Sequence, residues 1–361
     1  MKGCIWKLSL QRQGGCAGTR AYSSFSQRLH HELTSRQLPL SFDYLYPQPS
    51  HLLDLTLADL FPRSGIFSRT GTTLPSISHP SQLTPGHHLV YFPPQVPLSQ
   101  LLPDGTDTLH IPGAPFNRRL WAGGSVKFSS TRNLLLDGGR AVCIESVRDV
   151  ITKGQSGEER IVVRIERQIG KVGEKETENE IRTRIWCDSA DIGPHTSIIE
   201  NRDLVFMRDK TADQLEEDKA KFSLAPRMIR SPPNPQFRYQ LKPTKALLFR
   251  FSALTFNAHS IHLDKLYTNS VEGYPNLLVH GPLTLTLIFT ALRHHLDSKG
   301  LEIRNIEYKN LAPLYVDEEL AICGKPKLAM DDTVWDVWIE GRDGGLTVKG
   351  TIQLEGDDLK L

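Results

Sequence analysis

Alternating apolar and polar positions dominate two long parts of the chain. Residues 141–150 and 160–169 each alternate along their length, and residues 154–157 supply a turn between them. A period of two residues predicts strands that bury one face. After residue 300, four further runs have strand character, and residues 341–345 read as a hairpin turn. These runs are residues 302–311, 319–329, 333–342 and 346–354.

One apolar run does not alternate and has the character of a helix. It extends from Leu283 to Leu296, directly after Pro282. Proline suits the first position of a helix, because its missing N–H has no intrahelical partner there. The sequence therefore predicts a helix, and Arg293 near its end favours a core helix over a membrane span. A long apolar helix followed by an antiparallel meander is what a sheet wrapped around a helix requires.

The remaining segments carry shorter patterns. We expect strands at residues 86–92, 174–187 and 237–251, the last of them running into the polar cluster described below. Short helices are expected at residues 51–60 and 211–221.

Composition and length indicate a two-domain globular protein. The chain has 361 residues, a formal net charge of +2 and five scattered cysteines. The charge gives no reason to expect a nucleic-acid partner, and no stretch is long and apolar enough for a membrane span. An odd, sparse set of cysteines without metal-ligand spacing favours reduced thiols inside a cell. The proline-rich segment at residues 231–235 is the expected linker between the domains.

The first 36 residues differ from the rest of the chain. They are basic, contain serine and glycine, and have no acidic residue before Glu32. This composition is typical of a mitochondrial transit peptide and a disordered leader. Arg20, Ala21 and Tyr22 also resemble a processing site with cleavage before Ser23. The expected location is the mitochondrial matrix. The alternative is a basic disordered N-terminus that carries no targeting signal.

Residues suited to proton transfer gather just before the predicted helix. Asn257, His259 and His262 fall within six residues, and Asp264 follows them. Histidine can take or give a proton near neutral pH. The backbone N–H groups at the start of the helix, including that of Gly281, lie at its positive end and can polarise a carbonyl.

This segment resembles the hydratase-2 motif of MaoC-like (R)-specific enoyl-thioester hydratases and 3-hydroxyacyl-thioester dehydratases. In TFNAHSIH, residues 255–262, His262 takes the place of the family's catalytic histidine. Asn257 stands where the family usually has aspartate, and His259 stands where it has asparagine. The longer string FSALTFNAHSIH is similar to a subgroup that contains mitochondrial type 2 dehydratases and mesaconyl- or itaconyl-CoA hydratase-like proteins.

The resemblance implies an α+β double hot-dog fold, with two repeats of an antiparallel sheet wrapped around a helix. Residues 37–230 would form a degenerate hot-dog domain, and residues 231–361 the catalytic one. The degenerate domain would widen the acyl-thioester tunnel and replace the partner protomer of a single-domain dimer. A homodimer of the whole chain is left open.

The resemblance also implies roles for the residues of the motif. His262 would be the principal acid or base, Asn257 would orient water or the substrate hydroxyl, and Gly281 would polarise the thioester. The supporting residues would be His259 within the loop, Asp264 as the cap of a turn, and His280 either in the site or as a bridge between backbone groups. No metal and no cofactor are implied.

A second informative stretch begins at Arg118. Similar proteins carry the segment RRLWAGG of residues 118–124 in their N-terminal half. Arg118 and Arg119 are candidates for the phosphates of coenzyme A or a phosphopantetheine arm, because guanidinium groups pair with phosphate through two hydrogen bonds. The alternative is a surface loop that Trp121 anchors to the core.

These features predict a hydro-lyase. The preferred function is a mitochondrial (3R)-3-hydroxyacyl-thioester dehydratase that acts on acyl-carrier-protein or CoA thioesters in type II fatty acid synthesis. One alternative is a mesaconyl- or itaconyl-CoA-type hydratase. An alternative of another class is a non-catalytic protein that binds acyl thioesters.

Overall fold

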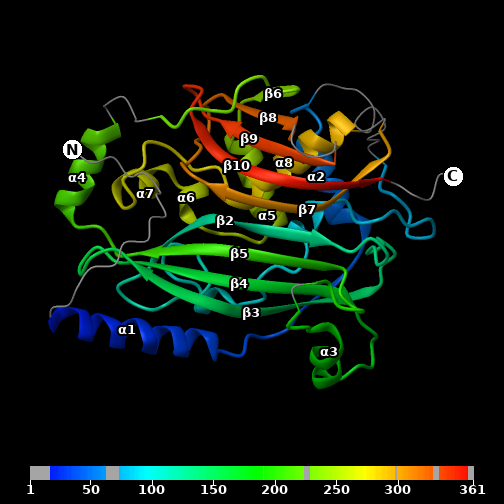
Figure 1. The fold of residues 1–361 in the computed structure, drawn as a ribbon, viewed down its shortest axis with the longest axis horizontal. Coiled ribbons are helices and arrows are strands. Elements are labelled where there is room, and N and C mark those ends of the chain that lie inside the picture. Colours follow the sequence, from blue (N-terminus) through cyan, green and yellow to red (C-terminus); the bar gives the residue numbers. More distant parts are fainter. Residues whose placement is uncertain are drawn as a thin grey trace.

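The structure is a computed structural model that describes residues 17–61, 73–189, 191–222, 228–296, 299–327 and 333–356. Ten strands in these ranges form one sheet in the order β1-β3-β4-β5-β2-β7-β10-β9-β8-β6. All neighbouring strands are antiparallel. Figure 1 shows them stacked from β3 near α1 to β6 at the opposite side.

The two halves of this sheet repeat one topology. The N-terminal half contains β1 (Ser41–Tyr44), β2 (Arg118–Phe128), β3 (Arg140–Lys153), β4 (Arg160–Lys171) and β5 (Ile198–Met207). The C-terminal half contains β6 (Phe237–Leu241), β7 (Leu301–Asn310), β8 (Leu320–Pro326), β9 (Val334–Glu340) and β10 (Leu346–Gly356). From its outer edge inward, each half orders its strands as first, third, fourth, fifth and second. The strands expected from alternation are thus confirmed.

The two repeats meet at their second strands. β2 pairs with β7 from Gly123 opposite Lys309 to Lys127 opposite Asn305. Close by, the Trp121 indole N–H donates to the Tyr308 hydroxyl at 2.7 Å. Two copies of one strand order joined through equivalent strands form the double hot-dog arrangement, so the expected fold is confirmed.

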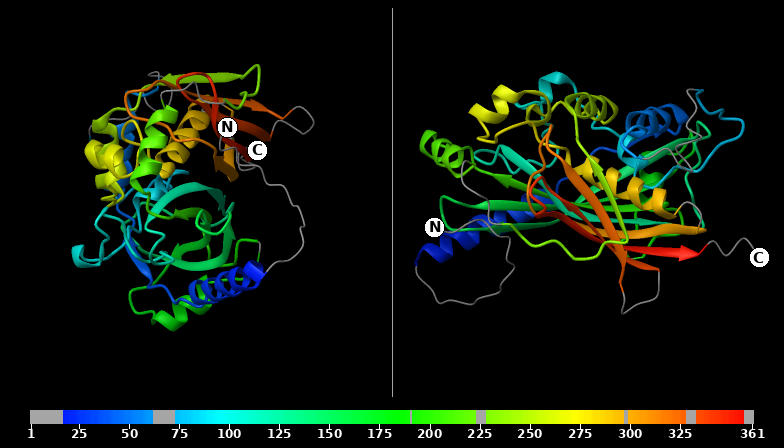
Figure 2. Two further views of the ribbon diagram at one scale, coloured as in Figure 1. Left: turned by 90° about the vertical axis from the view of Figure 1, so that its left-hand side faces the viewer. Right: turned by 90° about the horizontal axis from the view of Figure 1, so that it is seen from above.

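The predicted core helix is α8 (Gly281–Leu296). Every residue from Leu283 to Leu292 is buried, as expected of a helix that is apolar on all sides. The hydroxyl groups of Thr286 and Thr290 donate to carbonyl groups one turn earlier, at 2.9 and 2.8 Å. Both buried hydroxyls therefore have a hydrogen-bond partner within the helix. In Figure 2, the yellow and orange helices lie together on one side of the strands.

The N-terminal repeat differs from its partner at the position of this helix. In the C-terminal half, α5 (Lys245–Leu254) and α8 both lie between the first and second strands. In the N-terminal half, α2 (Pro47–Leu57) follows the first strand, as α5 does. Over the described residues between β1 and β2, the only later helices are η2 (His87–Val90) and η3 (Leu98–Gln100). The inner face of the N-terminal sheet is therefore left open to a cavity.

Two of the three strands expected from shorter patterns are helices. Residues 86–92 contain η2, whose four residues are all buried. Residues 174–187 contain α3 (Glu178–Ile185), which begins with a capping box between Thr177 and Glu180. A capping box satisfies two backbone N–H groups at a helix start, and this local signal prevails over the weak alternation of charges.

The third expected strand, residues 237–251, is divided in two. β6 ends at Leu241, and α5 begins after Thr244, whose side chain accepts a hydrogen bond from the Leu247 N–H. In α5, Leu247, Leu248 and Phe251 are buried on one side, a spacing that fits a helix as well as it fits an apolar strand. The expected helices at residues 51–60 and 211–221 correspond to α2 and α4 (Ala212–Phe222).

The predicted leader is partly folded. Helix α1 (Ala17–Thr34) lies along β3 (Figure 1), and Leu29 and Leu33 are buried in a cluster with residues of the N-terminal sheet. The guanidinium of Arg36 donates to the carbonyl groups of Leu109 and Ile111. The expectation of disorder is therefore wrong for residues 24–36, because their apolar side chains have a surface to cover. Residues 1–16 lie outside the described residues.

Candidate active site

The motif occupies a sharp turn between two helices. After α5 ends, Phe256 has a φ of +52°, and the Asn257 N–H donates to the Ser252 carbonyl at 2.9 Å. The Asn257 side-chain oxygen accepts the His259 N–H at 3.0 Å, so it stabilises the turn from within. A short helix, α6 (Ser260–Leu263), follows and carries His262.

His262 is positioned as a base. Its Nδ1 lies 2.8 Å from the Leu278 carbonyl oxygen, which can only accept a hydrogen bond. The proton of the neutral ring is therefore on Nδ1, and Nε2 keeps its lone pair. Burial lowers the pKa of His262 to about 4, with a further contribution from Arg119, while the bond to Leu278 acts in the opposite direction. The imidazole is neutral near pH 7.

His280 packs against the imidazole ring of His262. Its ring stacks on that of His262 with 3.6 Å between the centroids, and its Nε2 lies 2.8 Å from the Ser252 hydroxyl. Phe251 packs on His280 at 5.2 Å between ring centroids. His280 is fully buried and is not part of the cavity wall.

Asp264 lies outside the site. Its carboxylate accepts hydrogen bonds from the N–H groups of Leu266 and Tyr267 at the start of α7 (Lys265–Ser270). The side chain is exposed and caps this helix.

A cavity of about 690 Å³ brings the motif together with the N-terminal half. His262, His259, Asn257 and Gly281 all line it. A Cβ atom added to Gly281 would lie 2.6 Å from the Cβ of Trp121, so only glycine lets the start of α8 approach β2 this closely. The opposite wall comes from strands β2, β4 and β5, and includes Leu120, Ile165, Leu204 and Val205.

The two arginines expected to meet phosphate have different positions. Arg118 is buried, donates to Glu272 at 2.8 Å, and does not line the cavity. The phosphate role expected for Arg118 is therefore wrong, because an internal carboxylate already occupies its guanidinium. Arg119 does line the cavity and pairs with Asp107 at 2.8 Å. Both arginines begin strand β2, so the alternative of a surface loop is also wrong.

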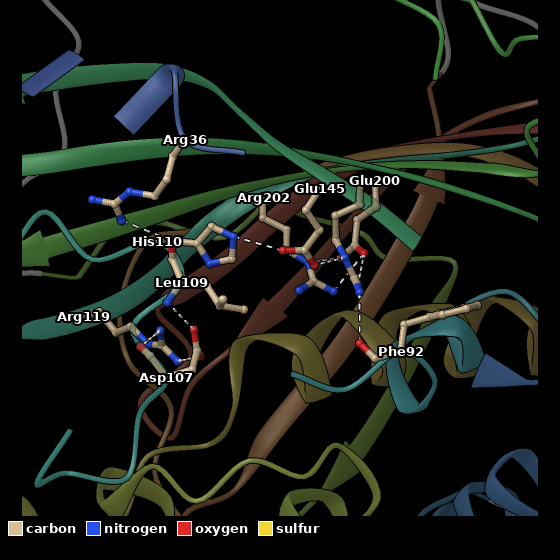
Figure 3. A network of polar contacts seen from close by, with 10 residues as sticks. Arg36, Phe92, Asp107, Leu109, His110, Arg119, Glu145, Glu200 and Arg202 are labelled. Atoms are coloured by element: carbon tan, nitrogen blue, oxygen red, sulfur yellow. Dashed lines mark hydrogen bonds and ion pairs between the residues drawn. The ribbon is translucent and has the colours of Figure 1, made fainter. Parts of the chain in front are cut away.

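Sequence reasoning missed a buried ionic network on the cavity wall (Figure 3). Glu145 on β3, Arg167 on β4 and Glu200 on β5 are direct cross-strand neighbours. Arg167 lies 2.7 Å from Glu145 and 2.9 Å from Glu200. Arg202 pairs with Glu200 at 2.8 Å, and His110 lies 3.0 Å from Glu145.

The carboxylates of this network are ionised. Burial alone would raise the pKa of Glu200, but Arg202 and Arg167 bring it down to about 2. For Glu145, Arg167 and His110 likewise outweigh burial and lower the pKa far below its usual range. One signal was visible in the sequence: Glu145 and Arg167 occupy inward positions of strands that are otherwise apolar on that face.

The described residues form neither a metal centre nor a membrane-spanning helix. Among them, no group of three or more His, Cys, Asp or Glu side chains is arranged to hold a metal ion. In the same ranges, no helix combines the length and the apolar character needed to cross a bilayer.

Comparisons with known proteins agree with this geometry. The family model "Hydroxyacyl-thioester dehydratase type 2" matches residues 86–316. The mitochondrial hydroxyacyl-thioester dehydratase type 2 of Schizosaccharomyces pombe is 29% identical over 292 residues, 78% of this chain and 88% of the relative. The mesaconyl-C(4)-CoA hydratase of Chloroflexus aurantiacus is 32% identical over 281 residues, 76% of this chain and 85% of the relative.

A solved structure supports the fold. The MaoC-like dehydratase of Phytophthora capsici superimposes with a TM-score of 0.53 at 14% identity, covering 91% of this chain and 99% of that one. The family model spans well over half of the chain and includes the motif with His262. The chain therefore has the fold of that structure and belongs to the hydroxyacyl-thioester dehydratase type 2 family of hydro-lyases.

Proposed function

We propose that the protein interconverts (3R)-3-hydroxyacyl thioesters and trans-2-enoyl thioesters in mitochondrial type II fatty acid synthesis. Membership of the family makes it a hydratase or dehydratase. The observation that carries the proposal is the neutral His262, whose Nε2 is free of the Leu278 bond, on one cavity wall with Asn257 and Gly281.

The chemistry follows from these three groups. In hydration, His262 Nε2 takes a proton from water as the water oxygen bonds to C3. The electron pair of the double bond moves onto the thioester as an enolate, which the positive end of α8 at Gly281 stabilises. C2 then receives a proton and His262 gives up the proton that it took, so the sum is the addition of one water. The Asn257 amide cannot exchange a proton in this way, and it holds the water or the product hydroxyl in place.

A second candidate has the same chemistry and a different acyl group. Arg119, Arg167 and Arg202 all line the cavity, facing Asp107 and Glu145. A carboxylate at the far end of a short acyl chain would find hydrogen-bond donors there. This favours a C4 or C5 dicarboxylic substrate, such as that in the name of the Chloroflexus aurantiacus relative. The apolar side chains of the same wall, among them Leu109 and Leu204, favour a fatty chain.

A substrate comparison distinguishes the two candidates. Purified protein is assayed with crotonyl-CoA, trans-2-decenoyl-CoA and mesaconyl-CoA, and kcat/KM is measured for each. We expect crotonyl-CoA and decenoyl-CoA to be hydrated and mesaconyl-CoA to be at least tenfold poorer. The reverse order, with loss of mesaconyl-CoA turnover in Arg202→Met, would favour the second candidate. Tight binding of all three thioesters without turnover would favour a binding protein.

We place the protein in the mitochondrial matrix. The Schizosaccharomyces pombe relative is named as mitochondrial, and the basic leader before Ser23 has the composition of a transit peptide. Sequencing the N-terminus of protein from purified mitochondria should give a start near Ser23 in the matrix fraction. A full-length N-terminus in a cytosolic fraction would contradict this location.

A further inference from the structure

A second histidine of the motif has a carboxylate partner from the other half of the molecule. His259 Nε2 lies 3.4 Å from the Oδ2 atom of Asp104, a residue of the loop before β2. Both residues are buried, with 5% and 7% of their surface exposed, and His259 lines the cavity beside His262. Within the described residues, Nδ1 of His259 has no hydrogen-bond partner, so the nitrogen remote from Asp104 is available to the cavity.

The Asp104 loop is fixed onto the motif by its backbone. The Asp104 carbonyl accepts the Ser260 N–H at 2.8 Å, directly after His259. Its Oδ1 accepts both the N–H and the hydroxyl of Thr106, at 2.9 and 2.7 Å. These bonds leave Oδ2 directed at the imidazole. The separation of 3.4 Å is long for a hydrogen bond, and such contacts shorten when substrate completes an active site.

The groups around His259 act in opposite directions on its protonation. Among the described contacts, His259 is the only group within 4 Å of Asp104 that can carry a positive charge. A buried carboxylate is stable when a cation compensates it. The other charged or titratable groups facing His259 are His262 and His280 from the C-terminal half and Arg119 from β2. Burial, His262 and Arg119 lower the pKa of His259 well below its ordinary value in the free protein. Asp104, at 3.4 Å, is the anion placed to stabilise the imidazolium when the ring is protonated during the reaction.

We infer that Asp104 and His259 form the second proton-transfer pair of the active site, in place of the carboxylate that Asn257 cannot supply. The inference rests on the proposed hydratase function. In hydration, neutral His262 takes the proton from water as the water oxygen bonds to C3, and His259, protonated against Asp104 in the substrate complex, gives its proton to C2. The C3–O and C2–H bonds form, the π bond between C2 and C3 breaks, and one water is added; dehydration is the reverse. The proton on His262 then returns to His259 by exchange with water.

A structural role for His259 makes different predictions. Asparagine is the residue that the wider family has at this position, so His259→Asn should be accommodated without loss of the fold. A loop-supporting histidine would tolerate this change with little effect on rate. A proton-transfer histidine would not, and Asn257→Asp in the same chain would then restore a titratable group beside His262.

The test compares variants by steady-state kinetics with crotonyl-CoA and its 3-hydroxy product, across the pH range in which the enzyme is stable. His259→Asn should lower kcat about 10²-fold or more, the usual contribution of a general acid or base, while KM changes little. Asp104→Asn keeps the size of the side chain and should lower kcat about tenfold. The pH profile of His259→Asn should lose its alkaline limb, because that limb reports deprotonation of the acid.

The double variant Asn257→Asp/His259→Asn provides the rescue. It should recover at least tenfold of the kcat lost in His259→Asn. The matched control is His30→Asn, because His30 and Asp149 form a similar pair at 3.5 Å on the surface, far from the catalytic machinery. It should leave kcat and the pH profile unchanged.

The outcomes separate this inference from the proposed function. If the wild-type protein hydrates crotonyl-CoA and His259→Asn does so equally well with an unchanged pH profile, only the role of His259 is refuted. If His259→Asn is impaired and the added Asn257→Asp change recovers no activity, the inference that Asp104 and His259 replace the missing carboxylate is refuted. If the wild-type protein turns over no enoyl thioester, the proposed function fails and the inference fails with it.

Discussion

Replacing Gly105 with alanine tests how strongly the catalytic motif depends on the N-terminal half. Gly105 has a φ of +83°, and an added Cβ atom would lie 2.2 Å from the carbonyl oxygen of Ala258 and 2.8 Å from its carbon. Both are backbone atoms of the motif. The loop must therefore move away from the motif, and Asp104 must move with it.

The cost of this change has two parts. A left-handed conformation costs a non-glycine residue about 1–2 kcal/mol. Loss of the hydrogen bond from Ser260 to the Asp104 carbonyl adds about 1 kcal/mol. We therefore expect the free energy of unfolding to fall by about 2–3 kcal/mol in Gly105→Ala. We also expect kcat to fall at least tenfold, because the loop that carries Asp104 no longer packs against His259 and His262.

Gly113→Ala is the matched control. Gly113 has a φ of +92°, but a Cβ atom there would meet nothing within 4 Å. This variant should lose only the conformational part, about 1–2 kcal/mol, and keep kcat within about twofold of wild type. Urea unfolding gives the stabilities, and crotonyl-CoA hydration gives kcat. Equal kcat values for the two variants would refute the dependence of the motif on the Asp104 loop.

Three further results are expected. Arg167→Met leaves Glu145 and Glu200 without their shared buried cation and should lower the free energy of unfolding by about 3–5 kcal/mol, measured by urea unfolding; a loss below about 1 kcal/mol would contradict it. The pKa of Glu200 falls from 4.5 to about 2 on folding, so its contribution to stability is complete above pH 4.5 and is lost as the pH falls toward 2. In Glu200→Gln, the free energy of unfolding should therefore depend less steeply on pH in that window. An unchanged slope would refute the low pKa of Glu200. A fragment that begins at Phe237 exposes the β7 edge that pairs with β2 and should aggregate or be inactive, whereas a soluble, fully active fragment would refute the need for the N-terminal half.

The sequence predicts the parts of the fold whose signals are local. Strands β3 and β4 alternate over many residues, and α8 is apolar on all sides, so each pattern fits one kind of element. Two of the three wrong strand predictions lie in short apolar runs. Residues 86–92 and 237–251 fit a buried helix as well as a strand, and only tertiary packing decides between them.

In the candidate site, too, the sequence predicts the residues that are neighbours in the chain and misses the contacts that form only on folding. His262 and Asn257 are recognised because they are neighbours in one motif. The sequence does not predict the pairing of Arg118 with Glu272, because the two residues are distant in sequence and meet only after folding. The approach of Asp104 to His259 has the same origin, since the two residues are distant in sequence and meet only where the loop before β2 contacts the motif.

The most direct test of the central claim is the hydration of crotonyl-CoA by wild-type protein and by His262→Ala. The account predicts turnover by wild type and a loss of about 10²- to 10⁴-fold in kcat for the variant, with an unchanged thermal unfolding midpoint. The exposed His79, changed to alanine, serves as the control and should behave as wild type. A His262→Ala enzyme with the kcat/KM of wild type would contradict the assignment of His262 as the group that moves the proton.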